Sequence, residues 1–140
     1  WNMTTVVLDA SVVLKWILSD NEELVEEAKK LHDQIISGEL RAVAPESILV
    51  EVANVMFWKK RFKKKEIISF LGHLGDGVIN IVSYYNFEIS ELLDIMDQDN
   101  LSIYDAYYVL LAKKNDCKVI TLDEKILKIG GLAVNASDFS

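Results

Sequence analysis

The sequence has little of several features that would indicate other classes of protein. No stretch approaches the roughly 18 apolar residues that a membrane-spanning helix needs, and no charged-then-apolar leader is present. Neither a membrane span nor a signal peptide is therefore expected. The single cysteine, Cys117, cannot form an internal disulfide, and its apolar neighbours predict a buried thiol rather than a nucleophile. This cysteine usage suits a reducing compartment, so a cytoplasmic location is expected.

Linkers and repeats are also missing. With one proline in 140 residues, and no low-complexity or Pro/Gly/Ser-rich tract, nothing divides the chain. Met3 is the expected natural start, with Trp1 and Asn2 an addition before it. Residues 3–140 are therefore expected to form a single domain, large enough for one hydrophobic core.

Charge is unevenly distributed along the chain. A net charge of −7 argues against broad, nonspecific nucleic-acid binding. Residues 59–65, however, read K-K-R-F-K-K-K, six cations in seven residues. Two interpretations stay open for this run: a solvated helix end and loop, or a rim that contacts phosphates.

Strand patterns alternate with helical patterns along the whole sequence. Short β-branched runs predict strands at 4–8, 41–44, 79–82, 118–121 and 132–134. Apolar residues at helical spacing predict helices at 10–18, 21–37, 45–59, 67–74, 89–96, 102–115 and 124–129, with Pro45 as a first helical residue. This alternation predicts an α/β fold, a three-layer α/β/α sandwich with a central, mainly parallel sheet. Ligands bind such folds beyond the carboxyl ends of the strands.

Four acidic residues stand where a core would place other residue types. They lie in V-V-L-D-A-S (6–11), L-V-E-V-A-N (49–54), L-S-I-Y-D-A (101–106) and I-T-L-D-E-K (120–125). The acids are Asp9, Glu51, Asp105 and Asp123. Carboxylates that converge out of water need a cation between them, so the four predict a shared metal-binding pocket.

Asp9 and Asp123 each follow a predicted strand, and each has a structural alternative as a helix N-cap. Ser11 is placed to cap the helix instead of Asp9, which would free that carboxylate. Thr121 supplies a hydroxyl that can order the loop before Asp123 or a bound water.

Glu51 and Asn54 are the polar residues of a helix that is otherwise apolar on nearly every face. Their spacing makes them neighbours, so Asn54 is expected to hold a carboxylate in place. A buried ion pair or a protonated glutamate is the alternative for Glu51. Asp105 follows Ser102 at capping-box spacing, but its same-face neighbours point it inward.

Oxygen donors without histidine or cysteine at ligand spacing favour Mg²⁺ or Mn²⁺ over Zn²⁺. His32 and His73 are expected to be surface or boundary residues. No phosphate-binding glycine loop and no nucleophile beside a base is present. The chemistry that suits such a site is metal-assisted hydrolysis of a phosphodiester.

These blocks, in this order, resemble the PIN domain and specifically its compact prokaryotic VapC-type toxins. The matching segments are D-A-S-V-V-L-K-W (9–16), E-V-A-N (51–54), L-S-I-Y-D-A-Y-Y-V-L-L-A (101–112) and V-I-T-L-D-E-K-I-L (119–127). The likeness runs from Val6 to about Leu132, and 101–127 is its most specific part.

The resemblance implies a Mg²⁺- or Mn²⁺-dependent endoribonuclease that is the toxin of a toxin–antitoxin pair, is held inactive by a cognate antitoxin protein, and forms a homodimer. Asp9, Glu51, Asp105 and Asp123 match the family's acidic quartet, which is both catalytic and metal-binding. Matches to the supporting polar positions are Ser11, Asn54, Ser102 and Thr121. Lys15 and Arg41 are weaker candidates for contacts with RNA phosphates.

Two other classes remain as alternatives. A phosphoacceptor receiver domain is also a small acidic α/β sandwich, but it should show an acidic pair after the first strand, where this chain has Leu8 before Asp9. A non-catalytic PIN-like scaffold in an RNA-processing assembly would be favoured by loss of one acid, and all four are present. Metal-dependent RNA cleavage would separate the nuclease from both.

Overall fold

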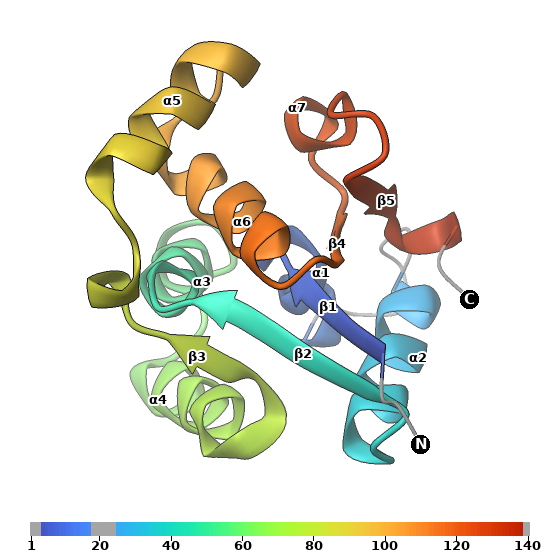
Figure 1. The fold of residues 1–140 in the computed structure, drawn as a ribbon. Coiled ribbons are helices and arrows are strands. Elements are labelled where there is room, and N and C mark those ends of the chain that lie inside the picture. Colours follow the sequence, from blue (N-terminus) through green and yellow to red (C-terminus); the bar gives the residue numbers. More distant parts are fainter. Residues whose placement is uncertain (1–3, 18–24, 139–140) are drawn as a thin grey trace.

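The computed structural model describes residues 4–17 and 25–138. The expectations about Trp1 and Asn2, and about the chain between 18 and 24, lie outside the described residues. The described chain forms a central sheet with helices on both sides (Figure 1). The predicted three-layer α/β/α architecture is confirmed. None of the described helices is both long and apolar enough to cross a membrane.

The sheet has five strands, and every neighbouring pair is parallel. Its order is β3-β2-β1-β4-β5. The strands are β1 (Thr4–Leu8), β2 (Leu40–Pro45), β3 (Asn80–Val82), β4 (Lys118–Thr121) and β5 (Ala133–Asn135). Strand β1 takes the central place because Val6, Val7 and Leu8 are apolar and fully covered on both faces. The chain adds strands on one side of β1 and then on the other, so strand order reverses between β1 and β4.

Seven helices flank the sheet in the described chain. They are α1 (Ala10–Leu14), α2 (Val25–Ile36), α3 (Ser47–Trp58), α4 (Lys64–His73), α5 (Ile89–Asp99), α6 (Ile103–Lys114) and α7 (Glu124–Leu127). Helix α6 packs across β1, β2 and β4, and α5 covers its outer side. Helix α2 packs on β2, whereas α1 contacts both β4 and α3. The packing of α6 on the central strands brings its first turn close to their carboxyl ends.

The predicted boundary at Pro45 is wrong. Pro45 is the last residue of β2, paired with Val82 of β3, and not the first residue of a helix. Proline has no backbone N–H to donate, and the last residue of a strand does not need one. The fixed φ of proline suits extended backbone as well as the start of a helix. Glu46 continues the ladder by donating its N–H to Val82 O over 2.9 Å, and α3 begins at Ser47.

Smaller differences concern short turns. The helix expected over 10–18 ends at Leu14 and continues as a 3₁₀ turn over Lys15–Ile17. A second 3₁₀ turn, Tyr84–Asn86, follows β3. After α4, a wide turn over Leu74–Val78 returns the chain to the sheet, with Gly77 at a φ of 90° that few other residues adopt.

Candidate active site

Asp9 leaves the carboxyl end of the central strand and is buried, with 5% of its surface exposed. Its N–H donates to Ile120 O of β4 over 3.2 Å, which fixes the backbone between β1 and β4. Asp9 occupies the N-cap position of α1, yet its carboxylate makes no cap hydrogen bond. The side chain is therefore committed to something other than capping.

Two hydroxyl groups hold one oxygen of this carboxylate. Asp9 Oδ2 accepts from Thr121 Oγ1 at 2.7 Å and from Ser11 Oγ at 2.8 Å. Each hydroxyl also accepts a backbone N–H from the loop after β4: Ser11 from Leu122 at 3.0 Å and Thr121 from Asp123 at 2.9 Å. Ser11 therefore does not replace Asp9 as a cap; together with Thr121 it ties the ends of β1 and β4 around the carboxylate.

The pKa of Asp9 is raised, because burial removes the carboxylate from water. The hydroxyls of Thr121 and Ser11 oppose that rise by bonding to the charged form, and the charge of Asp123 adds to it. The two hydroxyl donors therefore favour the ionised form of the Asp9 carboxylate in a buried position that otherwise disfavours a charge.

Glu51 lies on α3 and is bound by a single described partner. Tyr108 Oη of α6 donates to Glu51 Oε2 over 3.2 Å. The other oxygen, Glu51 Oε1, is buried without any hydrogen-bond partner. Burial and then the charge of Asp9 raise the pKa of Glu51 from 4.5 to about 7, the bond from Tyr108 opposes the rise, and Asp105 adds to it. A buried carboxylate oxygen that has no hydrogen-bond partner and lies near other acids is available to accept a cation or a proton.

The sequence interpretation gives Tyr108 no part in the site. The residue is fully buried, and burial followed by the charge of Glu51 raises its pKa above the usual range, so it is a permanent donor. Its position three residues after Asp105, on the face that points inward, was the signal that could have identified it. A tyrosine in an apolar stripe otherwise looks like a core residue.

Asp105 lies in the first turn of α6. Ser102 caps this helix by accepting the N–H of Asp105 over 3.3 Å, as its spacing predicts. The Asp105 carboxylate is half-buried; burial and then the charges of Asp123 and Asp9 raise its pKa. The positive end of the helix dipole favours the ionised form at this position.

Asp123 does cap α7, because its Oδ1 accepts the N–H of Lys125 over 2.9 Å. The capping alternative for Asp123 is therefore observed. The charge of Asp123 nonetheless raises the pKa values of both Asp9 and Asp105.

The four acids thus come from the residue after β1, from α3, from α6 and from the loop after β4, and their charges act on one another. In the described chain, no group of three or more His, Cys, Asp or Glu side chains is arranged so that it could hold a metal ion as it stands. The donor set is nonetheless all oxygen, and one buried oxygen has no partner. These donors fit a hard divalent cation, provided that the carboxylates draw closer together.

Two predicted contributors, Asn54 and Arg41, do not join this group. Asn54 is exposed, and no hydrogen bond between described residues joins it to Glu51. Arg41 lies at the amino-terminal end of β2, opposite Thr5, and thus at the other end of the sheet from Asp9. Lys15 is half-buried in the turn after α1, four residues beyond Ser11. The basic run of 59–65 connects α3 to α4 and is exposed apart from Phe62.

The sequence pattern of the PIN domain matches residues 6–132, a span that contains the four acids, Ser11, Tyr108 and Thr121. The chain belongs to the PIN domain family. Asp9 and Asp123 lie where the strand order of the sheet reverses, and parallel α/β sheets generally bind ligands at such a position. No curated protein matches the sequence significantly.

Solved structures share this fold at low sequence identity. PAE2754 from Pyrobaculum aerophilum has a TM-score of 0.68 at 15% identity, over 96% of this chain and 90% of its own. A toxin–antitoxin complex from Klebsiella pneumoniae gives 0.67 at 13%, over 94% and 97%. VapC20 of Mycobacterium tuberculosis, described as a sarcin–ricin loop cleaving toxin, gives 0.69 at 12%, over 93% and 98%. Such likeness establishes the fold of this PIN domain across nearly its whole length.

Proposed function

We propose that this PIN domain is a Mg²⁺- or Mn²⁺-dependent endoribonuclease that hydrolyses RNA phosphodiester bonds as the toxin of a toxin–antitoxin pair. The observation that carries the proposal is the buried Asp9 carboxylate, held by Ser11 and Thr121 at the reversal of strand order, together with Glu51, whose buried Oε1 has no partner and whose pKa the charges of Asp9 and Asp105 raise. A fold has no need of such an arrangement for its own stability, because each added buried charge costs free energy.

In this proposal, Asp9, Glu51, Asp105 and Asp123 hold the cation. Asp9 is the fixed ligand, since its hydroxyl partners set the orientation of the carboxylate. Glu51 is the adjustable one: with a pKa of about 7 it accepts or releases a proton near neutral pH. A bound Mg²⁺ or Mn²⁺ supplies a lowered pKa for the attacking water and neutralises charge on the phosphate.

Tyr108 orients Glu51 through its hydrogen bond, and Thr121 orients Asp9 while holding the loop that carries Asp123. Both act as positioning residues, comparable to the partners that orient ligands around other metals. Ser102 has the same role for Asp105, through the start of α6.

The proposed function also implies three partners: an antitoxin protein, a second copy of the chain and the RNA substrate. The toxin–antitoxin complex among the similar structures supports a protein antitoxin as the partner that restrains cleavage. A homodimer is supported by exposed apolar side chains on neighbouring helices: Val50, Phe57 and Trp58 on α3 and Ile68 on α4. Lys15 and the 59–65 run are the candidates for contacts with RNA phosphates.

The decisive test is cleavage of a mixed panel of structured and single-stranded RNAs by the purified protein in Mg²⁺, Mn²⁺ or EDTA. Asp105→Asn removes a charge at the site, whereas Asp94→Asn removes an exposed charge on α5 and is the matched control. We expect cleavage that requires the metal, survives Asp94→Asn and is lost in Asp105→Asn. Circular dichroism confirms that each variant is folded.

Cleavage that persists in Asp105→Asn would show that the pocket is assigned incorrectly. No cleavage of any RNA, by a folded protein that also fails to bind Mg²⁺ or Mn²⁺, would favour the non-catalytic scaffold instead.

A further inference from the structure

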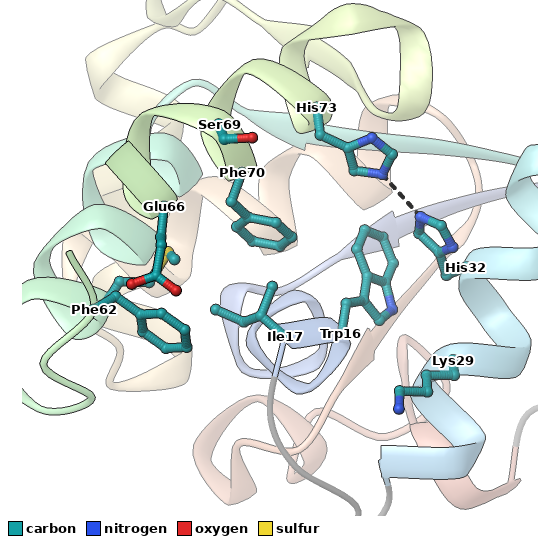
Figure 2. A pocket seen from close by; sticks show the side chains of 10 residues that line it. Trp16, Ile17, Lys29, His32, Phe62, Glu66, Ser69, Phe70 and His73 are labelled. Atoms are coloured by element: carbon teal, nitrogen blue, oxygen red, sulfur yellow. Dashed lines mark hydrogen bonds between the residues drawn. The ribbon is translucent and has the colours of Figure 1, made fainter. Parts of the chain in front are cut away.

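A second group of polar side chains lies in a pocket that contains none of the four acids. This pocket, of about 610 Å³, is formed by the turn after α1, by α2 and by α4. Figure 2 shows His32 of α2 and His73 of α4 on its wall with their imidazole rings turned toward each other, and Trp16 beside them. These are the two histidines of the whole chain.

The contact between them is close and direct. The two Nε2 atoms are 2.9 Å apart, so one imidazole donates its N–H to the bare nitrogen of the other. The edge of Trp16 packs on His32, with ring centroids 4.8 Å apart, and Trp16 itself is tied to α2 by its Nε1–H bond to Ala28 O at 2.7 Å. His32 is thus held from one side, while His73 is exposed and its ring stacks near Phe70, with ring centroids 6.5 Å apart.

This spacing is what a shared metal ion requires. Two nitrogen ligands about 2.1 Å from one metal are about 3.0 Å apart at a right angle and about 3.4 Å apart at a tetrahedral angle. For a metal to replace the shared hydrogen, the observed separation needs to grow by a few tenths of an ångström and the imidazole rings must turn so that both Nε2 lone pairs point at the ion. Neutral imidazole prefers Zn²⁺, Cu²⁺ and Ni²⁺ over the hard cations that carboxylates bind.

We propose that His32 and His73 form a two-ligand site for a borderline divalent transition-metal ion (Cu²⁺, Ni²⁺ or Zn²⁺), which links α2 to α4 across this pocket and is separate from the acidic site. No third His, Cys, Asp or Glu of the described chain completes a cluster around them. Glu66 lies at the other side of the pocket, next to Phe62 (Figure 2). Water fills the remaining coordination positions, so the ion exchanges with solvent rather than being a permanent structural element.

The consequence concerns the relation between two helices. Helix α2 packs mainly on β2 and the turn after α1, and α4 packs mainly on α3. The histidine pair is a polar contact that joins the two directly. A metal ion bound by both histidines would fix the distance between α2 and α4. It would therefore set the size of the molecules that can enter the pocket.

The test is titration of the full, untagged chain with NiCl₂, ZnCl₂, CuCl₂ and MgCl₂. We expect one equivalent to bind at the histidine pair, with affinity falling in the order Cu²⁺, Ni²⁺, Zn²⁺, and Mg²⁺, which binds at the acids, should not compete for the histidine pair. At a tenfold excess over the dissociation constant, Ni²⁺ should raise Tm by about 4 °C. His73→Gln and His32→Gln should each lower the affinity at least tenfold, and Asp105→Asn should leave it unchanged.

Imidazole nitrogen resonances give a readout that needs no variant, because the chain has two histidines. Zn²⁺ should shift the Nε2 signals of both together at one equivalent. Failure of the wild type to bind, unchanged binding in His73→Gln, or a shift of one imidazole alone would each overturn the proposal. Loss of binding in Asp105→Asn would show instead that the ion sits among the acids.

Discussion

The Asp9 carboxylate accepts a hydrogen bond from Thr121, a residue much later in the sequence. Thr121 gives its hydroxyl hydrogen to Asp9 and takes the N–H of Asp123, so that one small side chain serves two of the four acids. Since Thr121 is fully buried, no water can substitute for it. The geometry of the acidic group therefore depends on this hydroxyl together with that of Ser11.

Thr121→Val keeps the shape of the side chain but removes its hydrogen-bonding capacity. We expect unfolding free energy to fall by about 2–3 kcal/mol, because a buried carboxylate oxygen and a backbone N–H both lose a partner. Cleavage should fall roughly 10–100-fold. Urea denaturation and RNA cleavage measure the two effects, and Thr121→Ser, which keeps the hydroxyl, should restore both. Wild-type behaviour of Thr121→Val would remove Thr121 from its positioning role.

Glu51 makes the stability of the metal-free protein depend on pH. Its pKa is about 7 in the folded chain against an ordinary 4.5, so the folded state holds this proton more tightly than the unfolded state. The stabilisation is fully present below pH 4.5 and is lost as pH rises through 7. Allowing for screening by solvent, we expect a loss of about 1–3 kcal/mol between pH 5 and pH 8 in EDTA.

Urea denaturation at several pH values in EDTA measures this slope. Glu51→Gln cannot ionise and should flatten it in that range. A slope that is the same in wild type and Glu51→Gln would assign the pH dependence to other groups.

The acids themselves are predictable from the sequence, but their partners are only partly so. Asp9 and Asp123 are identified because an acid within two residues of the end of a buried strand is conspicuous, and Ser102 because capping spacing is local. Tyr108 is missed, since its bond to Glu51 joins residues 57 positions apart. Asn54 shows the opposite error: helical spacing places it near Glu51, but the rotation of α3 against the core leaves it exposed.

Among the helices, α3 and α4 together present an exposed apolar face, defined by Val50, Phe57, Trp58 and Ile68. Each of these side chains is at least half exposed. Phe57 and Trp58 pack edge to face with ring centroids 4.9 Å apart, which gives the face a rigid aromatic centre. Aromatic side chains of this kind are typical of the buried centre of a protein interface.

Trp58→Glu places a charge in the centre of the α3–α4 apolar face. If the proposed homodimer uses this face, the wild type should have twice the 15.9 kDa chain mass and the variant a single chain mass. Size-exclusion chromatography with light scattering measures it. Ile36→Glu, a similarly exposed apolar position on α2, is the control and should leave the mass unchanged. A Trp58→Glu variant that stays dimeric would place the interface elsewhere.

Elements with a strong local pattern are predicted well, and those set by tertiary contacts are not. The β-branched runs predict β1 and β4 to the residue. Pro45 is misplaced because its fixed φ suits both a helix start and a strand end, and pairing with β3 decides between them. The 3₁₀ turn Tyr84–Asn86 depends on Ser83 and on a hydrogen bond from the Tyr84 N–H to Glu46. Glu46 lies far from this turn in the sequence, so the local pattern does not predict the turn.

At the scale of the molecule, a protein with a net charge of −7 places several acids at one edge of its sheet. Millimolar Mg²⁺ or Mn²⁺ should therefore raise Tm by several degrees, beyond what NaCl of the same ionic strength does. In EDTA, Asp9→Asn should itself raise Tm by relieving like-charge repulsion, and it should abolish the metal response. Thermal denaturation followed by circular dichroism measures both. An equal metal response in Asp9→Asn would show that the cation binds elsewhere.

The order of the strands has a consequence for the time at which activity can arise during synthesis. Strand β1 leaves the ribosome early, yet its neighbour β4 and the hydroxyl that holds Asp9 come 112 residues later. A nascent chain that ends before Thr121 has Asp9, Glu51 and Asp105 but no means of closing the sheet around them. Contacts between such distant segments form late in folding, so the proposed site cannot assemble until Thr121 has been synthesised.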